Sequence, residues 1–333
     1  MRPDVESWFR SRTSRAADWA LPALMAAKAE RGATVSVVLP ALDEQETVGA
    51  IVSLIVTALG AGVPPDRRLV DELVVLDSGS RDRTAGVAAA AGATVVHRDD
   101  VLPRISAVSG KGEAMWRSLA ATTGDLVVFI DADLRSFTPA YVTGLLGPLL
   151  TDPQTALVKA VYERPFVNGE AVVHAGGGRV TELVARPLLN LHWPELAGVV
   201  QPLAGEYAAR RSLLETLPFP CGYGVELGLL VDTLESVGLQ AIAQVDLGVR
   251  RHRHHDEQRL GRMAADIMQT AYSRLAVEGR GSEQHTATFG LGTTLAQFQR
   301  VGDSFDLVEH EIGGLERPPM LTVPEYAAAR CPQ

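Results

Sequence analysis

Two aspartates, separated by one residue, follow the most apolar segment in the first half of the chain. Asp131 and Asp133 flank Ala132, directly after the run DLVVFI (125–130), which has the form of a buried strand. Two carboxylates at one strand end repel each other, and Mg²⁺ is held by one or two carboxylates together with phosphate oxygens of a substrate. The spacing indicates a divalent cation and a phosphorylated ligand; the alternative is that one aspartate caps the next helix and the other is solvated.

Two further motifs could bind anions. Lys111 stands between two glycines at the expected start of a helix, where a point charge suits a phosphate or a sugar hydroxyl; the alternative is a solvated loop lysine. Three glycines at 176–178 precede Arg179, Val180 and Thr181, so that backbone N–H groups, a guanidinium and a hydroxyl could converge on a phosphate. The alternative for this second motif is a hinge that leads into a helix.

The elements that must position these residues alternate regularly. Short β-branched runs at 34–39, 72–76, 93–96 and 125–130 are separated by stretches of helical length, which predicts a doubly wound, mainly parallel α/β sheet. Ligands of such sheets bind beyond the carboxyl ends of the strands. At these ends stand Pro40, Ala41, Leu42 and Glu44 after the first strand, and Asp77, Ser78 and Gly79 after the second. Asp77 could bind a base or ribose; the alternative is that this loop only starts the next helix, with Ser80 or Asp82 as the N-cap.

The second half of the chain is less regular. We expect a glycine loop that leads into a helix over 176–191, helices at 223–237 and about 256–275, a strand at 241–249 that leads to His252 and His254, and an irregular tail from 278. A zinc site at these histidines lacks a fourth ligand, whereas His252 could join Asp133 on one cation. We divide the chain into a helical arm (1–33), a regular first half (34–150), a less regular second half (151–277) and the tail (278–333).

Composition excludes several classes of function. The 333 residues carry a net charge of −9, so no basic field would hold a nucleic acid or an anionic membrane. The uncharged stretch 47–65 contains glycines and ends in two prolines, which favours a helix buried against a sheet over a membrane span. The two cysteines, Cys221 and Cys331, are typical of a reduced, cytoplasmic chain. Neither a dinucleotide-binding G-x-G-x-x-G nor a P-loop follows the first strand.

Taken together, these motifs resemble the nucleotide-sugar-dependent glycosyltransferases of the GT-A fold. More narrowly, the chain is similar to the actinobacterial glucosyl-3-phosphoglycerate synthases, a retaining family that also contains a mannosyl-3-phosphoglycerate synthase. The resemblance extends in order from 34 to about 275. It rests on the segments VVLPALDE, LVVLDSGS, GKGEAMWRSLA, FIDADL, GGGRVTELVARPLL, QPLAGEYAARR, GYGVELGLLVD and QVDLGVRRHRH, with ERPPM near the end.

The resemblance implies that the half 34–150 binds the nucleotide sugar and that the half 151–277 binds the acceptor, and it implies roles for matching positions. The donor UDP-glucose would contact Pro40, Ala41, Leu42, Glu44, Asp77, Ser78, Gly79, Lys111, Asp131, Ala132, Asp133, Tyr223 and Glu226. The acceptor 3-phosphoglycerate would contact Gly178, Arg179, Val180, Thr181 and His254, and the metal, Mg²⁺ or Mn²⁺, would be held by Asp133 and His252. The catalytic residues would be Asp133, Lys111 and Glu226. Mycobacterial members have Ser in place of Ala132 and Asn in place of His254. Ala132 would contribute only its backbone, whereas the change at His254 affects the expected acceptor geometry.

The implied reaction transfers glucose from UDP-glucose to the 2-hydroxyl of 3-phospho-D-glycerate, with retention at the anomeric carbon and release of UDP. The implied partners are these two substrates and a second copy of the chain in a homodimer. GDP-mannose is the alternative donor, because the strand-end motifs do not separate uracil from guanine. A non-catalytic nucleotide-sugar sensor is the alternative from another class, and the presence of Asp131, Asp133, Lys111 and His252 argues against it.

Overall fold

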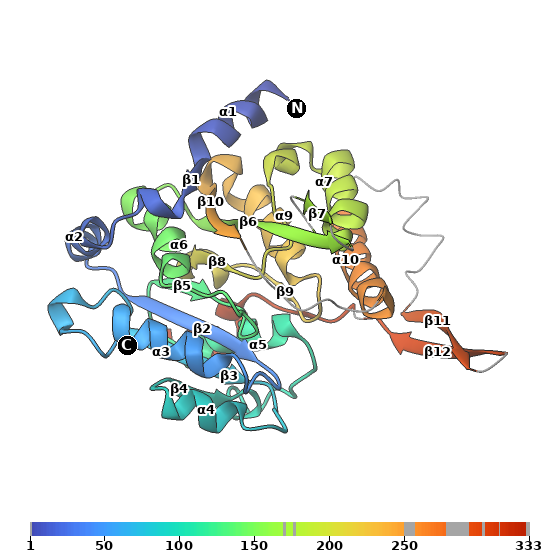
Figure 1. The fold of residues 1–333 in the computed structure, drawn as a ribbon, viewed down its shortest axis with the longest axis horizontal. Coiled ribbons are helices and arrows are strands. Elements are labelled where there is room, and N and C mark those ends of the chain that lie inside the picture. The colour runs from blue at the N-terminus through green and yellow to red at the C-terminus, as the bar shows by residue number, and fades with distance from the viewer. Residues whose placement is uncertain are drawn as a thin grey trace.

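One sheet organises the molecule (Figure 1). The computed structural model describes residues 2–168, 171–175, 178–249, 257–277, 293–301, 304–312 and 314–330. The strand order is β1-β10-β6-β8-β5-β2-β3-β4, with β7 paired to β6 outside this path. The strands are β1 (Thr13–Arg15), β2 (Val35–Ala41), β3 (Glu72–Asp77), β4 (Thr94–His97), β5 (Leu126–Phe129), β6 (Leu157–Asn168), β7 (Ala171–Ala175), β8 (Tyr207–Arg210) and β10 (Ile242–Val249).

The predicted mainly parallel sheet is confirmed. β8 runs antiparallel to its neighbours β5 and β6, and every other pair along the order is parallel. The predicted strand–helix alternation of the first half is present, with α3 (Val48–Ala58), α4 (Thr84–Ala90) and α5 (Lys111–Ala121) between successive strands. Strands from both predicted halves, 34–150 and 151–277, share this sheet.

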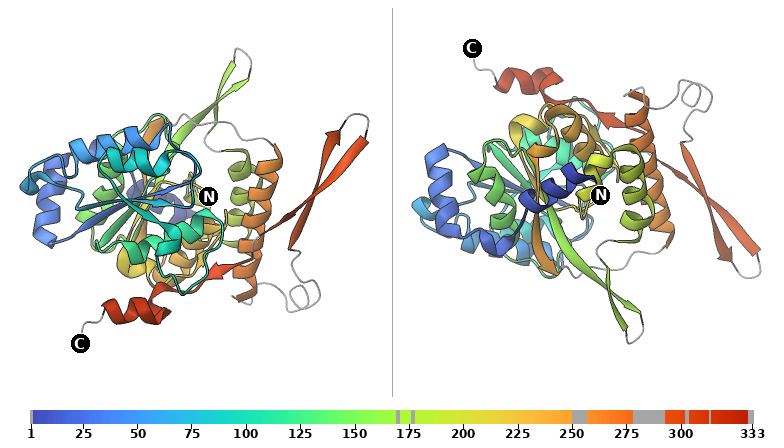
Figure 2. Two further views of the ribbon diagram at one scale, coloured as in Figure 1. Left: turned by 90° about the horizontal axis from the view of Figure 1, so that it is seen from below. Right: turned by 90° about the horizontal axis from the view of Figure 1, so that it is seen from above.

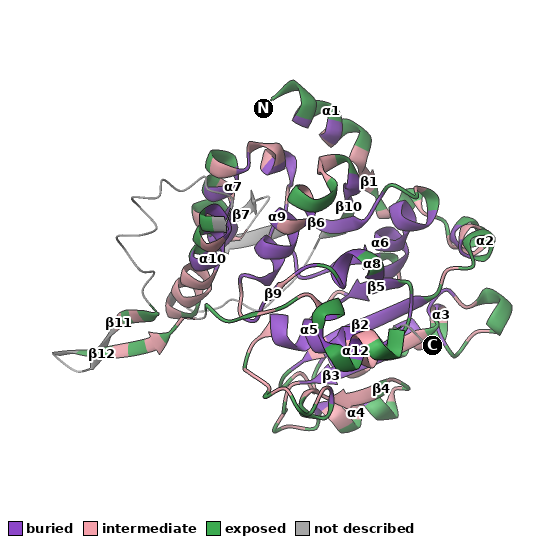
Figure 3. Ribbon diagram, turned by 180° about the vertical axis from the view of Figure 1, so that it is seen from behind, coloured by how far each residue is buried: buried purple, intermediate pink, exposed green. Residues whose placement is uncertain are grey.

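Helices bury both faces of the sheet, which explains the continuous apolar runs of its strands. Along β5, Val127 and Phe129 belong to one hydrophobic cluster and Leu126 and Val128 to the other, as the alternation of a strand requires. One face is covered by α2 (Leu21–Arg31), α3 and α6 (Ala140–Thr151); the other is covered by α5, α7 (Arg186–His192), α9 (Val225–Val237) and α10 (Glu257–Val277). Figure 3 shows the central strands buried between these layers.

The N-terminal segment differs from the single helical arm expected there. It forms α1 (Pro3–Arg12), then β1, a 3₁₀ turn η1 (Ala16–Asp18) and α2. β1 extends the sheet, because Thr13 pairs in parallel with Gln244 of β10, and the indole of Trp8 donates to the carbonyl of Ile242 at 2.9 Å. A three-residue strand is too short to show an alternating pattern in the sequence. It forms because it pairs with the edge of β10.

Two strands of the second half were also not predicted. β6 and β8 fill the centre of the sheet, and β8 is four residues long and rich in alanine, which is depleted in strands. The remaining elements of this half are short: α8 (Arg211–Leu214), β9 (Phe219–Pro220) and the 3₁₀ turns η5 (Pro194–Gly198) and η6 (Leu239–Ala241). The 3₁₀ turns η2 (Pro65–Arg67) and η3 (Arg98–Asp100) lie in the first half.

The expectation of an irregular tail is wrong for the part of the tail that the structure describes. β11 (Thr294–Val301) and β12 (Ser304–Glu311) form an antiparallel hairpin that projects from the body in Figure 2, tied to α10 where Gln297 donates to the carbonyl of Gln258 at 3.1 Å. β13 (Glu316–Arg317), η7 (Met320–Thr322) and α12 (Pro324–Arg330) follow. Cross-strand pairing and packing on the body hold these segments in place. Neither kind of contact produces a periodic pattern in the sequence.

Among the described residues, no helix is both long enough and apolar enough to cross a membrane.

Candidate active site

A cleft of about 1390 Å³ lies beyond the carboxyl ends of β2, β3 and β5, where a doubly wound sheet binds ligands. Segments that are far apart in the sequence meet in its wall: the end of β2, the start of α5, the end of β5, the segment 178–183 and the start of α9. Of the residues predicted to bind the donor, the cleft wall contains Pro40, Ala41, Leu42, Glu44, Ser78, Lys111, Asp131, Ala132, Asp133, Tyr223 and Glu226.

Asp77 and Gly79 do not contribute to this wall. Asp77 is buried and accepts hydrogen bonds at 3.3 Å from the backbone N–H of Ser80. The alternative, an N-cap at Ser80 or Asp82, is not met, because the N-cap of α4 is Arg83. Asp82 nevertheless accepts from the N–H of Thr84 at 2.9 Å. Gly79 adopts a φ of 90°, a conformation that favours glycine. In the described structure the two residues shape the turn after β3.

The loops after β2 and β3 are joined by hydrogen bonds. The backbone N–H of Asp43 donates to the Ser80 hydroxyl at 3.0 Å, and its carboxylate accepts from the N–H of Arg81 at 2.7 Å. The N–H of Glu44 donates to Thr84 Oγ1 at 2.8 Å. These bonds fix the loop that presents the exposed Leu42 to the cleft.

Lys111 and Asp131 form the central ion pair of the cleft. Lys111 is the first residue of α5, and its Nζ lies 2.6 Å from Asp131 Oδ1 and 2.8 Å from Glu226 Oε1. Burial lowers the pKa of Lys111, but the two carboxylates outweigh burial and hold that pKa well above its ordinary value. The lysine is therefore charged at neutral pH, and it neutralises part of the charge of an otherwise acidic site.

Three glycines make this arrangement sterically possible. A Cβ at Gly110 or Gly112 would overlap the backbone of Cys221 or Pro220, and Gly110 has a φ of 133°. The start of α5 thus packs directly on the segment before α9. A Cβ at Gly205 would lie 2.6 Å from Asp131 Oδ1 and would also overlap Lys111 Nζ. The motif QPLAGEY contained Gly205, but its role depends on this long-range contact.

The Asp131-Ala132-Asp133 motif fits a divalent cation. Its carboxylates face the cleft directly after β5, and the buried carbonyl of Ala132 accepts from Thr47 Oγ1 at 2.6 Å, which fixes the turn between them. Hard oxygen donors of this kind suit Mg²⁺ or Mn²⁺. Among the described residues, no group of three or more His, Cys, Asp or Glu side chains is arranged so that it could hold a metal ion by itself. The predicted ligand His252 lies outside the described residues, so its contribution stays a prediction.

The start of α9 contributes Tyr223 and Glu226. Glu226 is 7% exposed, and the backbone N–H of Tyr223 donates to Asp266 Oδ2 on α10 at 3.3 Å. A Cβ at Gly222 or Gly224 would overlap side chains of α10, so this helix packs closely behind the segment. Asp266 also lines the cleft, and no sequence motif had indicated it.

The segment predicted to bind the acceptor lies in the same cleft. Gly178, Arg179, Val180 and Thr181 line the wall; Arg179 is exposed and Thr181 is 2% exposed. The chain then forms a single π-helical turn, η4 (Thr181–Ala185), a feature often found at functional sites. His254 and the glycines at 176 and 177 lie outside the described residues. Arg98, Arg259 and Arg262 add positive charge to the wall, and sequence reasoning had missed all three.

A mainly parallel sheet with a carboxylate pair and a lysine at its carboxyl edge is the arrangement that the sequence led us to expect of a nucleotide-sugar transferase. Residues 36–216 match glycosyl transferase family 2, and the chain belongs to this family.

Relatives and solved structures narrow this assignment. A glucosyl-3-phosphoglycerate synthase of Mycolicibacterium smegmatis is 48% identical over 316 residues, which cover 95% of this chain and 98% of that protein. A protein of the same name from Petrotoga mobilis is 41% identical over 307 residues, with 91% of each chain covered. The predicted resemblance to this group is therefore confirmed.

Two solved structures match closely. A mannosyl-3-phosphoglycerate synthase from Rubrobacter xylanophilus superposes with a TM-score of 0.83 at 41% identity and covers 95% of this chain and 97% of that one. A glucosyl-3-phosphoglycerate synthase from Mycobacterium tuberculosis, in complex with Mn²⁺, UDP-glucose and phosphoglyceric acid, has a TM-score of 0.76 at 47% identity, with 91% and 94% covered. The predicted GT-A type fold is confirmed by these matches.

Proposed function

We propose that this protein transfers glucose from UDP-glucose to the 2-hydroxyl of 3-phospho-D-glycerate and releases UDP. The observation that carries the proposal is that one cleft holds Asp131, Asp133 and Lys111 at the sheet edge together with the Gly178–Thr181 segment. A donor site and a separate anion site thus open into the same space. The names of the relatives at 41–48% identity support this choice of substrates.

The donor would be held along the sheet edge. Leu42 and the fixed loop around it offer a surface for the uracil ring, and Lys111 offers a cation to the diphosphate. A divalent cation held by Asp133, with His252 as its predicted second ligand, would supply further positive charge where the leaving diphosphate becomes more negative.

The acceptor would be held by its phosphate. The guanidinium of Arg179 can bind two phosphate oxygens, and the hydroxyl of Thr181 can donate a third hydrogen bond. Their place at the start of a helix adds the favourable end of the helix dipole. This arrangement would leave the 2-hydroxyl of the acceptor free to approach the sugar.

Retention of the anomeric configuration needs no protein base if the acceptor attacks from the face that the diphosphate leaves, because a phosphate oxygen can take the hydroxyl proton. We assign the Glu226 carboxylate to a contact with the transferred sugar. Its ion pair with Lys111 supports a position on the donor side of the cleft. A Glu226→Gln variant with normal turnover would restrict Glu226 to a role in packing and would remove it from the catalytic residues.

The deciding experiment is a turnover assay of donor against acceptor with Mg²⁺ or Mn²⁺. UDP-glucose, GDP-glucose and GDP-mannose are each combined with 3-phosphoglycerate, while nucleotide release and product mass are followed. UDP release with a glucosyl-phosphoglycerate product is the expected result. Binding of every donor without turnover would instead favour a nucleotide-sugar sensor.

GDP-mannose is the second donor to test, because the TM-score of 0.83 belongs to a mannosyl-3-phosphoglycerate synthase. If the protein prefers GDP-mannose, the assigned site stays the same and the transferred sugar is mannose.

We also propose a homodimer in the cytoplasm. The β11–β12 hairpin extends from the body with Leu307 54% exposed, which suits contact with a second copy. Cys221 is a free thiol, in keeping with a reducing compartment. Sedimentation of the full chain, beside a variant with charged residues in place of Leu307 and Leu295, tests the assembly.

A further inference from the structure

The C-terminal segment 314–318 returns to the cleft and pairs with the chain just before Tyr223. β13 (Glu316–Arg317) is antiparallel to β9 (Phe219–Pro220), and the backbone N–H of Cys221 donates to the carbonyl of Leu315 at 3.0 Å. Gly314 and Leu315 line the cleft themselves. The predicted function assigned no role to this segment, although its ERPPM motif belongs to the family resemblance.

Arg317 of this segment binds a buried carboxylate on α5. Its Nε lies 2.6 Å from Glu113 Oε2 and its Nη2 lies 2.9 Å from Glu113 Oε1, the two-bond geometry that favours arginine over lysine. Nη2 also donates to the carbonyl of Ser106 at 2.6 Å, and the guanidinium lies over the Trp116 ring at 5.3 Å from its centroid.

Glu113 has no exposed surface, so its charge depends on its partners. Arg117, one turn further along α5, also donates to it, with Nε 2.6 Å from Oε1. Burial raises the pKa of Glu113, but hydrogen bonds from Arg317 and Arg117 outweigh burial and leave that pKa below its ordinary value. Loss of Arg317 would leave Arg117 as the remaining arginine that these contacts give the buried carboxylate.

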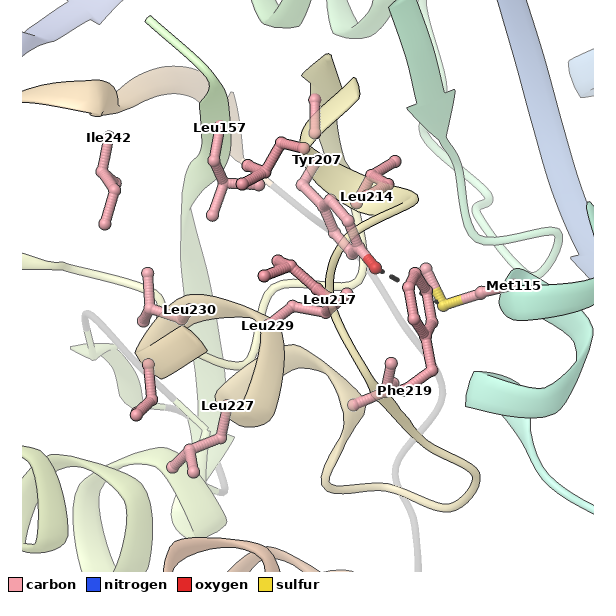
Figure 4. Packing of buried hydrophobic residues seen from close by; sticks show 14 of the residues in the cluster. Met115, Leu157, Tyr207, Leu214, Leu217, Phe219, Leu227, Leu229, Leu230 and Ile242 are labelled. Atoms are coloured by element: carbon pink, nitrogen blue, oxygen red, sulfur yellow. Dashed lines mark hydrogen bonds between the residues drawn. The ribbon is translucent and has the colours of Figure 1, made fainter. Parts of the chain in front are cut away.

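Glu113 lies two residues after Lys111, at the point where α5 meets the segment before α9. Its backbone N–H donates to the carbonyl of Cys221 at 3.3 Å, and Gly110 and Gly112 pack on the same backbone. The next turn of α5 continues the contact through Met115, whose sulfur accepts from the Tyr207 hydroxyl at 3.6 Å, with the Phe219 ring beside it (Figure 4). Three segments thus meet behind the Lys111–Glu226 pair.

We propose that Arg317 is a positioning residue of the active site. Through Glu113 and the β13–β9 pair, it holds the first turn of α5 against the segment 219–224 and so keeps Lys111 in contact with Asp131 and Glu226. The hairpin β11–β12 directly precedes this segment, so the same residue connects the protruding hairpin to the cleft. The expected loss of turnover rests on the proposed function. The expected change in hydrogen exchange rests on the contacts alone.

The test compares Arg317→Met and Arg317→Lys with Arg330→Met. Arg330 lies in the same C-terminal region and pairs with the buried Glu215 at 2.9 Å, away from the cleft, and so is a matched control. Turnover and amide hydrogen exchange are measured on the full chain, the exchange without substrates. Thermal unfolding of each variant is followed to verify that it is folded.

Arg317→Met is expected to lower kcat on the order of 10- to 100-fold, because small displacements of reacting groups have large kinetic effects. The acceptor KM should stay the same, since Arg179 is untouched. Exchange should increase in 108–114 and 219–226 and stay the same in β2 and β3. Arg317→Lys should recover part of the loss, and Arg330→Met should stay within about twofold of the unmodified protein.

A Glu113→Gln/Arg317→Met double variant tests whether Arg317 acts through Glu113. We expect the kcat of the double variant to be no lower than the kcat of the slower single variant, because the effects of substitutions at coupled residues do not add. Normal kcat in Arg317→Met, exchange that rises uniformly over the sheet, or an equal effect of Arg330→Met would each overturn the proposal. If the unmodified protein transfers no glucose, the proposed function fails, while the exchange measurement still decides the role of Arg317.

Discussion

Lys111 Nζ and Glu226 Oε1 lie 2.8 Å apart and join the first turn of α5 to the first turn of α9 across the floor of the cleft. The same ammonium contacts Asp131 at the end of β5. One side chain therefore connects three elements, the first and last of which are more than a hundred residues apart in the sequence. Its loss would leave two carboxylates facing each other in a partly buried site.

Lys111→Met should reduce kcat/KM for UDP-glucose on the order of 100-fold, because it removes the cation that faces the leaving diphosphate. Steady-state assays with varied donor measure this effect. Lys28→Met is the matched control: Lys28 pairs with Asp71 at 2.7 Å behind the sheet, so its loss should lower the melting temperature while kcat stays the same. Equal kinetic losses in both variants would contradict the assigned role of Lys111.

Asp133→Ala should abolish metal-dependent binding of the donor, because it removes a hard oxygen ligand from the sheet edge. Calorimetric titration of UDP-glucose with and without Mn²⁺ measures the binding. Asp66→Ala removes an exposed carboxylate in η2 and should leave the titration unchanged. Binding by Asp133→Ala that still responds to Mn²⁺ would show that the cation is held elsewhere.

Arg179→Ala should raise the KM for 3-phosphoglycerate about 10- to 100-fold, since a hydrogen bond to a charged group contributes about 1.5–3 kcal/mol. The kcat at saturating acceptor should change less. Arg104→Ala, at an arginine whose side chain is 84% exposed, is the control and should leave both constants unchanged. An unchanged acceptor KM in Arg179→Ala would mean that the acceptor phosphate binds at another place.

Gly205→Ala should lower kcat at least about tenfold, because a Cβ at this position overlaps both members of the Lys111–Asp131 pair. Gly86→Ala, on the open side of α4, meets no atom within 4 Å and should stabilise the helix by about 0.5–1 kcal/mol. Kinetics and urea unfolding of both variants separate the two effects. Full activity of Gly205→Ala would mean that the ion pair can shift without loss of function.

Lys159 gives a pH dependence of stability with a defined sign. It is 2% exposed, its Nζ donates to the carbonyl of Ala204 at 2.6 Å, and burial lowers its pKa from 10.5 to about 8. Between these values the unfolded chain binds a proton that the folded chain has lost, so folding becomes more favourable as pH rises, by at most about 1.4 kcal/mol per pH unit. Below about pH 8 the full cost of the buried charge remains.

Urea unfolding of the protein and of Lys159→Met from pH 7 to about 10 isolates this contribution. The difference in unfolding free energy, unmodified minus variant, should increase with pH above about 8. A difference that is flat or that falls with pH would show that Lys159 keeps its proton throughout this range.

The sequence by itself determined the sheet edge and most of the residues on it. Asp131, Ser78 and Pro40 each follow an apolar run, and parallel strands joined by right-handed crossovers bring their carboxyl ends to one edge. Local pattern and a topological rule are sufficient for this part of the site.

Only the tertiary structure decided how these groups are paired and held. The contact of Gly205 with Asp131, the binding of Glu113 by Arg317 and the addition of β1 to β10 all join segments far apart in the chain. None of these contacts leaves a period or a spacing in the sequence, because each depends on the distance between two backbones after folding. Local preferences determine which elements form, and the packing between elements determines which side chains meet.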